Sequence, residues 1–270
     1  MRKPGWVMRK PGWCVPVLLM AGCTAESLDP RPASPPAEGE PTTADVARLE
    51  DPMLTPAELT SSALTTAVLD ATGAAAMGAS AEARDVLAYA VGCALDTTQE
   101  ISLTVGGITY TYGGGLGIAP EWTTSALSAT KAAWVSACVV ARSNQLSRLI
   151  WISMRGNQTG LRAAADERTD FQIEEGAFWG NAFVDLGPIA AYSCDGVDQS
   201  VDDSYADLPF RQCAQWDGVS GSNRSPCGMS FAGQCRNVCG TTTAPYAGCS
   251  FLGGATSSTV VTTFLAGMPQ

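Results

Sequence analysis

The chain has 270 residues, with 16 Lys and Arg against 26 Asp and Glu and no His, which gives a formal net charge of −10. At about 150 residues per domain, this length allows one or two domains. The acidic balance argues against a nucleic-acid-binding protein, because phosphate binding needs a basic surface. The absence of His excludes Ser-His and Cys-His catalytic systems and His-ligated zinc or haem sites in this chain.

Residues 1–22 have the organisation of a signal peptide. A short apolar run at 15–21 follows a basic segment that contains no acidic residue. The basic residues of that segment are Arg2, Lys3, Arg9 and Lys10. The run is far shorter than the roughly 20 apolar residues that span a bilayer as a helix. The hexapeptide Met1–Trp6 recurs as Met8–Trp13, so the chain can start at Met1 or Met8 without damage to the signal. We therefore expect an exported protein.

The segment Leu19–Cys23 resembles the lipobox of bacterial lipoproteins, with Met20 in place of the usual Leu. The resemblance implies that Cys23 is acylated, becomes the mature N-terminus and anchors the protein to a membrane. Thr24, rather than Asp, follows the cysteine. By the same resemblance this favours the outer membrane, on its periplasmic or cell-surface face. The alternative is ordinary signal cleavage near Ala25, which would release a soluble protein.

A proline-rich segment follows the signal. Its prolines lie among Ser, Glu, Thr and Ala: Pro30, Pro32, Pro35, Pro36, Pro41, Pro52 and Pro56. Such a composition cannot bury a core and behaves as an extended spacer. We expect residues 23–54 to be a disordered tether and residues 55–270 to be a single domain with a cysteine-rich subregion at 190–250. Loss of residues 1–22 removes four basic residues and no acidic one, which leaves 12 basic against 26 acidic residues and a charge of −14.

Eight of the ten cysteines lie beyond the signal and the lipobox: Cys93, Cys138, Cys194, Cys213, Cys227, Cys235, Cys239 and Cys249. In an exported chain this even number predicts up to four disulfides. The last four lack the C-x2-C spacing of a zinc ribbon, so disulfides are expected rather than a metal site. The preferred pairs are Cys93 with Cys138, Cys194 with Cys213, and the last four among themselves.

The first half of the domain is predicted to contain two helices and a β-hairpin. Thr55–Glu58 is a capping-box pattern with Pro at the first helical position, and the apolar spacing after it predicts a helix at 56–71. A more apolar helix is predicted at 81–95. Alternating apolar side chains on either side of Gly106 and Gly107 predict a hairpin of 101–105 and 108–112, with all six apolar side chains on one face. The glycines at 113–117 fit no phosphate-binding loop and indicate turns.

A third helix is predicted from a cap at Thr124 or Ser125 to Asn144, with Cys138 beside its apolar stripe. If this helix packs on the second one, Cys93 and Cys138 approach the Cα separation of roughly 4.4 to 6.8 Å that a disulfide allows. A central strand is expected at 149–154, and further strands at 171–173 and 258–265. The expected fold class is α+β, with helices packed on a small antiparallel sheet, followed by a disulfide-stapled, loop-rich C-terminal segment.

Two sequence patterns suggest catalytic chemistry, but neither is specific enough to assign a catalytic residue. Ser128-Ala-Thr-Lys131 matches the S-x-x-K pattern of serine β-lactamases. Lys131 is the only lysine of the mature chain, so the companion K-T-G is absent. A chance match is preferred, with Lys131 in a solvated or snorkelling position. Carboxylate chemistry, as in glycosidases, needs two acids about 5 to 9.5 Å apart in a cleft. The candidates lie near aromatic residues: Glu121, Asp170, Glu174 and Glu175. Surface charges and helix caps are the preferred interpretation, so no catalytic residue is assigned.

Five aspartates crowd the segment between Cys194 and Cys213: Asp195, Asp198, Asp202, Asp203 and Asp207. Calcium favours several oxygen ligands, so the first four are candidate ligands of a structural calcium ion. The spacing fits no EF-hand, because Gly196 directly follows the first aspartate. A solvated loop is the preferred interpretation, and no metal or other cofactor is expected.

Four stretches resemble those of an uncharacterised family of cysteine-rich bacterial lipoproteins: Ala90–Leu95, Gly115–Trp122, Trp134–Cys138 and Glu175–Asn181. The resemblance covers about 85–250 and implies one domain and no particular activity. The leading hypothesis is a membrane-anchored envelope lipoprotein whose domain binds or has a structural role, with a cell-wall or envelope-protein partner. The alternatives are a carboxylate-dependent hydrolase acting on envelope glycans and a calcium-stabilised adhesion module.

Overall fold

The structure is a computed structural model that describes residues 46–48, 54–144, 150–196 and 213–266. The chain divides into two compact units, 1–40 and 41–270, and every described residue belongs to the second. Helices, a six-stranded sheet and a separate two-stranded hairpin confirm the expected α+β class.

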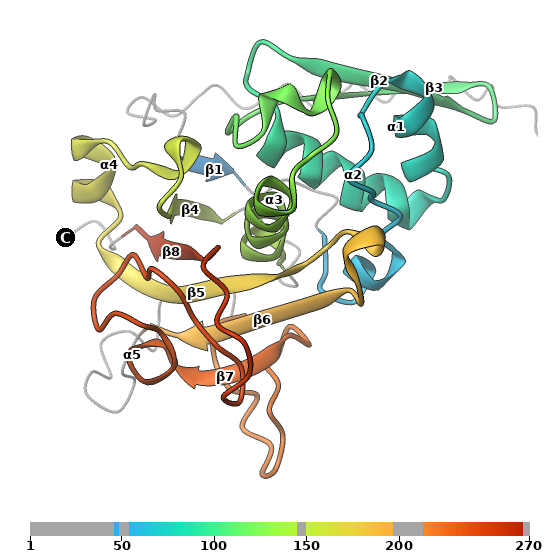
Figure 1. The fold of residues 1–270 in the computed structure, drawn as a ribbon. Coiled ribbons are helices and arrows are strands. Elements are labelled where there is room, and N and C mark those ends of the chain that lie inside the picture. The colour runs from blue at the N-terminus through green and yellow to red at the C-terminus, as the bar shows by residue number, and fades with distance from the viewer. Residues whose placement is uncertain (1–45, 49–53, 145–149, 197–212, 267–270) are drawn as a thin grey trace, which may run out of the picture. The chain divides into compact units, whose positions relative to one another are not determined.

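The sheet has the strand order β1-β4-β8-β5-β6-β7 (Figure 1). Its strands are β1 (Val46–Arg48), β4 (Trp151–Arg155), β5 (Ile173–Asn181), β6 (Ala190–Asp195), β7 (Ser230–Gln234) and β8 (Val261–Leu265). Neighbouring strands are antiparallel, except that β6 and β7 are parallel. The strands expected near 149–154 and 258–265 are confirmed as β4 and β8. The strand expected at 171–173 overlaps β5 only at Ile173, since β5 runs from there to Asn181. Strands β6 and β7 lie where loops were expected.

Three helices and the hairpin form the other layers of the described unit. They are α1 (Ala71–Met77), α2 (Ala81–Ala94) and α3 (Ala129–Arg142), with hairpin strands β2 (Glu100–Val105) and β3 (Ile108–Gly113). Helix α3 packs on β5 and β8, α2 packs on α3, and the hairpin packs against α1 and α2. The hairpin register is as predicted, with a turn at Gly106 and Gly107, whose φ angles of 60° and 82° suit glycine.

The helix expected at 56–71 is wrong. The capping-box contacts form, since Thr55 N donates to Glu58 Oε2 at 2.6 Å and Glu58 N donates to Thr55 Oγ1 at 3.3 Å. Only a single 3-10 turn, η1 (Glu58–Ser61), follows them. Backbone groups between 62 and 69 then bind distant partners: Leu64 O with Val184 N, Thr66 O with Leu127 N, and Leu69 N with Trp122 O. These long-range bonds replace the bonds between residues four apart that a helix needs.

The boundaries of α3 also differ from the expected ones. Ser128, rather than Thr124 or Ser125, caps the helix, and α3 ends at Arg142 rather than Asn144. The hydroxyls of Thr124 and Ser125 both donate to Glu121 O, at 3.1 and 3.2 Å. They close the 3-10 turn η2 (Pro120–Thr123), which leaves the cap of α3 to the next serine.

The sheet separates two hydrophobic cores. On the helix side, Phe178 of β5 and Val261 and Leu265 of β8 pack with α2 and α3. On the other side, Ala177 and Trp179 of β5 pack with residues of the C-terminal segment. This alternation follows the two-residue period of a strand. The remaining elements lie at the periphery of the two cores: η3 (Thr159–Leu161), α4 (Ala165–Asp170), η4 (Val184–Leu186) and α5 (Cys235–Val238).

Four disulfides pair all eight cysteines of the domain: Cys93–Cys138, Cys194–Cys235, Cys213–Cys227 and Cys239–Cys249. The predicted bond between α2 and α3 is confirmed, with a Cα separation of 6.1 Å. The predicted Cys194–Cys213 bond is wrong, and the last four cysteines do not pair only among themselves. The sheet explains the difference, because Cys213 and Cys227 belong to the helix-side core, whereas Cys194 and Cys235 belong to the opposite one.

Candidate functional site

Two of the four candidate acids, Glu174 and Glu175, are neighbours on β5. Glu174 Oε1 accepts a hydrogen bond from Tyr246 OH at 2.7 Å, and Tyr246 N donates to Thr262 Oγ1 at 3.1 Å. Glu175 Oε2 accepts from Thr263 Oγ1 at 2.6 Å. Because Thr262 and Thr263 are consecutive on β8, their side chains point to opposite faces of the sheet. The two carboxylates therefore belong to opposite faces and do not form a pair in one cleft.

Glu174 lies between the sheet and the C-terminal segment. A Cβ added to Gly196 would lie 2.5 Å from Glu174 Oε1, so the glycine allows the chain to pass close to the carboxylate. Burial raises the pKa of Glu174, and the hydrogen bond from Tyr246 opposes this rise only in part. Burial and the same hydrogen bond raise the pKa of Tyr246, which keeps its hydroxyl protonated as a donor. A carboxyl group with a raised pKa is suited to holding a proton, but here its contact with Tyr246 joins β5 to the C-terminal segment.

A further buried carboxylate, Glu167 of α4, was not among the sequence candidates. Its side chain is fully buried, and Ser153 Oγ of β4 donates a short hydrogen bond to Glu167 Oε1. Arg155 Nε donates to Ser153 Oγ at 2.9 Å, and the guanidinium carbon lies 3.8 Å from the centroid of the Phe264 ring. The Ser-x-Arg spacing on β4 is the only sequence signal for this cluster, and it is equally typical of a solvent-facing edge. The cluster attaches α4 to the sheet.

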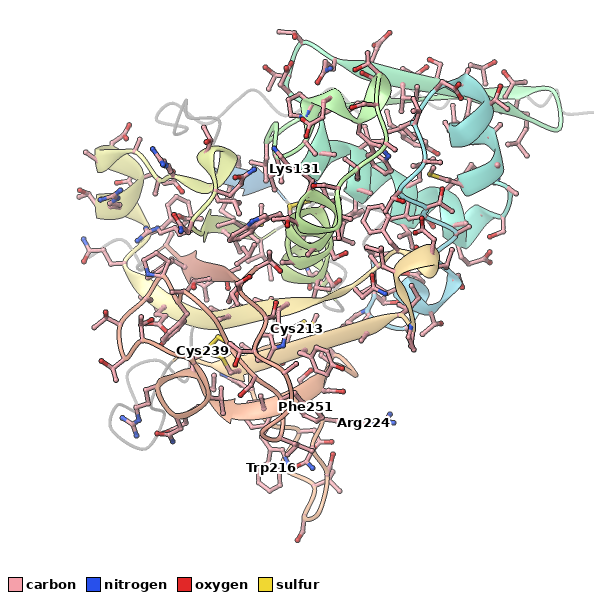
Figure 2. All side chains as sticks on the ribbon, viewed as in Figure 1. Lys131, Cys213, Trp216, Arg224, Cys239 and Phe251 are labelled. Carbon is pink, nitrogen blue, oxygen red and sulfur yellow. A yellow bond between two sulfur atoms is a disulfide. The ribbon has the colours of Figure 1, made fainter. Side chains whose placement is uncertain are left out.

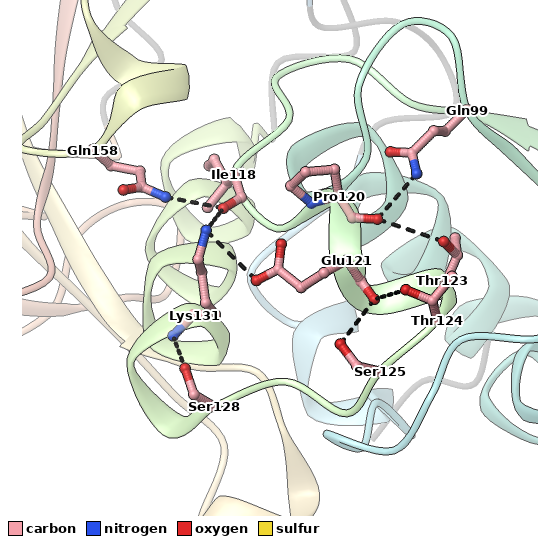
Figure 3. A network of polar contacts seen from close by, with 10 residues as sticks. All are labelled: Gln99, Ile118, Pro120, Glu121, Thr123, Thr124, Ser125, Ser128, Lys131 and Gln158. Atoms are coloured by element: carbon pink, nitrogen blue, oxygen red, sulfur yellow. Dashed lines mark hydrogen bonds and ion pairs between the residues drawn. The ribbon is translucent and has the colours of Figure 1, made fainter.

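Glu121 lies in a different network, on η2 (Figure 3). Its Oε1 is 3.6 Å from Lys131 Nζ, and the two side chains are 41% and 33% exposed. Lys131 Nζ also donates to Ile118 O at 2.6 Å, and Gln158 Nε2 donates to the same oxygen at 2.9 Å. Lys131 thus joins α3 to the segment before η2. An exposed ion pair of this kind contributes about 1 kcal/mol at most.

The S-x-x-K pattern has a structural explanation. Ser128 is the N-cap of α3, and its Oγ accepts a hydrogen bond from Lys131 N at 3.3 Å. The Lys131 ammonium group binds Ile118 O instead of the serine hydroxyl. A serine and a lysine three residues apart are therefore used here to begin a helix and to fix a neighbouring loop (Figure 3).

The remaining sequence candidates are spread over other parts of the chain. Asp170 is exposed at the end of α4. Asp195 ends β6, where it is paired with Gly176 and Gln234 of the neighbouring strands. Other predicted positions lie outside the described residues: Cys23, Asp198, Asp202, Asp203 and Asp207. Among the described residues, the four candidate acids have separate positions and partners.

Three sulfur atoms gather on the loop-covered face of the sheet. The Sγ atoms of Cys194, Cys235 and Cys239 all lie within 4.8 Å of one another, a separation that a metal ion could bridge. Zinc binds thiolates, however, and each of these sulfurs is already bonded in a disulfide. In the oxidised protein, the cluster therefore consists of two adjacent disulfides rather than a metal-ligand set.

Aromatic rings cover the same face. Trp179 stacks on Tyr192 with ring centroids 5.8 Å apart, and Tyr192 contacts Phe251 at 5.1 Å. A further aromatic residue, Trp216, lies on the loop closed by the Cys213–Cys227 bond and is 46% exposed (Figure 2). Its Nε1 donates to Ser222 O at 2.9 Å, which fixes the exposed indole in one orientation.

Comparisons of the chain with models of known families, with curated proteins and with solved structures found no match. Within the described ranges, none of the helices combines the length and the apolar character needed to cross a bilayer.

Proposed function

We propose that this chain is an exported, lipid-anchored protein of the bacterial outer membrane, whose domain acts by binding or as a structural component of the envelope. The observation that carries the proposal is the lipobox-like segment Leu19–Cys23 directly after a basic and apolar signal. The resemblance to cysteine-rich bacterial lipoproteins belongs to the same proposal. The membrane is then one partner, through the lipid on Cys23.

The disulfides support export. All eight cysteines of the domain are paired, and disulfides persist in the periplasm and at cell surfaces but are rare in a reducing cytosol. Two bonds lie in the helix-side core and two on the opposite side of the sheet. A chain with this covalent framework is suited to an oxidising compartment.

A binding or structural role, rather than catalysis, is supported by what the candidate polar groups do. Ser128 caps α3, Lys131 binds Ile118 O, and Glu174 and Glu175 accept hydrogen bonds from Tyr246 and a threonine of β8. These contacts hold elements together. A contact surface is offered by the oriented Trp216, since tryptophan is enriched at the energetic centres of protein interfaces.

The lipid anchor is tested in cells that express the full chain. With metabolic labelling by radioactive palmitate and membrane fractionation, the wild type is expected to carry label and to sediment with membranes. Cys23→Ser is expected to lose both properties. Cys14→Ser is the matched control, because it removes a cysteine of the same signal outside the lipobox, and it should behave as the wild type. Acyl label and membrane association that persist in Cys23→Ser would contradict the proposal.

Binding is tested with the chain from Thr24, which lacks the lipid-bearing Cys23, and purified cell-wall sacculi. Co-sedimentation without release of soluble fragments is expected, weakened in Trp216→Ala but not in Ile108→Ala, which removes another exposed apolar side chain. Release of fragments that is lost on substitution of Glu121, Asp170, Glu174 or Glu175 would instead establish a carboxylate-dependent hydrolase. Absence of both would contradict a cell-wall ligand and direct the search to envelope proteins.

A further inference from the structure

Two disulfides on the loop-covered face of the sheet lie against each other. Cys194–Cys235 joins β6 to α5, and Cys239–Cys249 joins the end of α5 to a turn of the C-terminal segment. The Sγ atoms of Cys194 and Cys239 belong to different disulfides but are only 3.8 Å apart. The sulfur of Cys194 therefore has one bonded sulfur neighbour and a second one in contact.

The local helix explains why both neighbours face Cys194. Cys239 N donates a hydrogen bond to Cys235 O at 2.9 Å, as in an α-helical turn. Residues four apart in such a turn lie on the same side of the helix. Exchange of the partner of Cys194 from Cys235 to Cys239 therefore requires side-chain rotation, without unfolding of α5.

The four cysteines are not equally buried. Cys194, Cys235 and Cys249 are completely buried, whereas Cys239 is only partly buried. Thiol–disulfide exchange depends on access to the sulfur that is attacked. Cys239 is therefore the cysteine of the cluster that is most open to an external reagent.

We propose that this cluster is a thiol–disulfide exchange site, in which an external dithiol reduces the Cys239–Cys249 bond and Cys239 then forms a new bond with Cys194. A thiolate of the dithiol attacks Cys239 Sγ, and Cys249 leaves as a thiolate with the electron pair of the broken bond. The second thiol of the reagent attacks the reagent sulfur that is bound to Cys239. This step releases Cys239 as a thiolate and leaves the reagent as an intramolecular disulfide.

In the last step, the Cys239 thiolate attacks Cys194 Sγ and Cys235 leaves as a thiolate. The two protons of the dithiol end on Cys235 and Cys249. One dithiol has then been oxidised, two disulfides have been broken and one has formed, so the chain holds three disulfides and two thiols, Cys235 and Cys249. The new Cys194–Cys239 bond still attaches α5 to β6.

The exchange has a structural consequence for the C-terminal segment. Cys249 loses its covalent bond to the end of α5, so the turn that carries Tyr246 is held only by non-covalent contacts, including the hydrogen bond to Glu174. The site thus couples the redox state of the surroundings to the attachment of this turn. The inference rests on the sulfur geometry and is independent of the lipid anchor on Cys23.

A variant that frees Cys239 tests the last step without a reductant. In the chain from Thr24, which lacks Cys23, Cys249→Ser leaves Cys239 as a thiol. The protein is incubated with a chelator at a pH near the usual thiol pKa of about 8.5, and the sample is then acid-quenched, alkylated and analysed by peptide mapping. We expect label on Cys235 and a Cys194–Cys239 cross-link. The exchange rate should fall about tenfold for each pH unit below the thiol pKa, because the thiolate is the nucleophile.

Cys227→Ser is the matched control for this experiment. It frees Cys213 in the opposite core, and the label is expected to stay on Cys213 with the other three disulfides intact. Label that stays entirely on Cys239 in Cys249→Ser at every pH, with Cys194–Cys235 intact, would overturn the proposal.

The chain from Thr24 with all eight cysteines provides a second test that needs no substitution. With one equivalent of dithiothreitol and rapid alkylation, the first two-thiol species is expected to carry label on Cys235 and Cys249 and to contain the Cys194–Cys239 bond. Intact Cys93–Cys138 and Cys213–Cys227 bonds in the same sample report that the fold is retained. Label on Cys239 and Cys249 with an unchanged Cys194–Cys235 bond would show simple reduction and would overturn the exchange step.

Discussion

Tyr246 links the C-terminal segment to both β5 and β8 by hydrogen bonds. Its ring is buried, its hydroxyl donates to Glu174 and its backbone N donates to Thr262 Oγ1. Tyr246→Phe removes the donor from the partly buried carboxylate of Glu174. We expect the free energy of unfolding to fall by about 1 to 3 kcal/mol near neutral pH, because a hydrogen bond to a charged group is lost. Urea denaturation measures the difference.

The pH dependence of this loss separates it from a packing defect. Burial raises the pKa of Glu174 above 4.5, so the folded state binds this proton more tightly than the unfolded chain does. The contribution to stability is complete below the unfolded pKa and is lost as the pH rises through the folded pKa. Tyr246→Phe removes a bond that lowers this pKa, so the deficit should be larger at about pH 7 than at about pH 4. Tyr112→Phe removes a hydroxyl on the hairpin as a control, and an equal loss at both pH values in Tyr246→Phe would contradict this account.

Ser128 offers a second test with single substitutions, because capping and nucleophilic catalysis predict different results. As the N-cap of α3, Ser128 should cost about 1 kcal/mol of stability when replaced by Ala. Ser128→Asp retains an acceptor for Lys131 N and should restore most of the loss, although it lacks a nucleophilic hydroxyl. Urea denaturation of both variants provides the measurement. A Ser128→Asp protein no more stable than Ser128→Ala would argue against the capping role.

At the scale of elements, the Cys93–Cys138 bond between α2 and α3 closes a much longer loop than the Cys213–Cys227 bond does. Cys93 and Cys138 are separated by 45 positions, and Cys213 and Cys227 by 14. In the chain-entropy model, the stabilisation grows with loop length, from about 3 kcal/mol for the shorter loop to about 4 kcal/mol for the longer one. We therefore expect the double substitution Cys93→Ala and Cys138→Ala to destabilise the protein more than Cys213→Ala and Cys227→Ala.

The comparison of these two double variants by urea denaturation is informative because all four cysteines belong to the same helix-side core. Each pair is almost or completely buried, so the loss of sulfur packing is similar in both. Equal destabilisation, or a larger loss for the shorter loop, would show that local strain or packing outweighs chain entropy.

Elements with local determinants could be predicted from the sequence, and elements with distant partners could not. The helix at α2 has its own cap in Ser80, and the hairpin has two glycines at its turn. In contrast, the segment after Glu58 begins with the capping-box contacts of a helix but continues with long-range backbone bonds. Strands β6 and β7 form where Gly, Ser and Cys are frequent, because pairing with β5 and the neighbouring core supplies what their local pattern lacks.

At the scale of the whole molecule, the candidate site residues also depend on distant partners that the local sequence does not reveal. Proximity to aromatic residues in the sequence selected Glu174 and Glu175, but their partners Tyr246 and Thr263 are 72 and 88 positions away. The face to which each carboxylate points depends on the register of β5 against β8, which includes an irregularity between Glu174 and Gly176. A sequence pattern carries no information on such a register shift. The same reasoning applies to Cys194, whose partner is decided by which side of the sheet each cysteine occupies.

The four disulfides together give a prediction for the whole molecule. The chain from Thr24, denatured without reductant, should have no thiol that reacts with Ellman's reagent, because all eight of its cysteines are paired. Each single Cys→Ser substitution among them should expose one thiol. Full reduction should lower the free energy of unfolding by at least several kcal/mol, since each bond restricts the unfolded chain by about 2 to 4 kcal/mol. Thiol counting and urea denaturation of the oxidised and reduced chain measure the two effects, and a stable reduced protein with eight reactive thiols would show that the disulfides are dispensable for the fold.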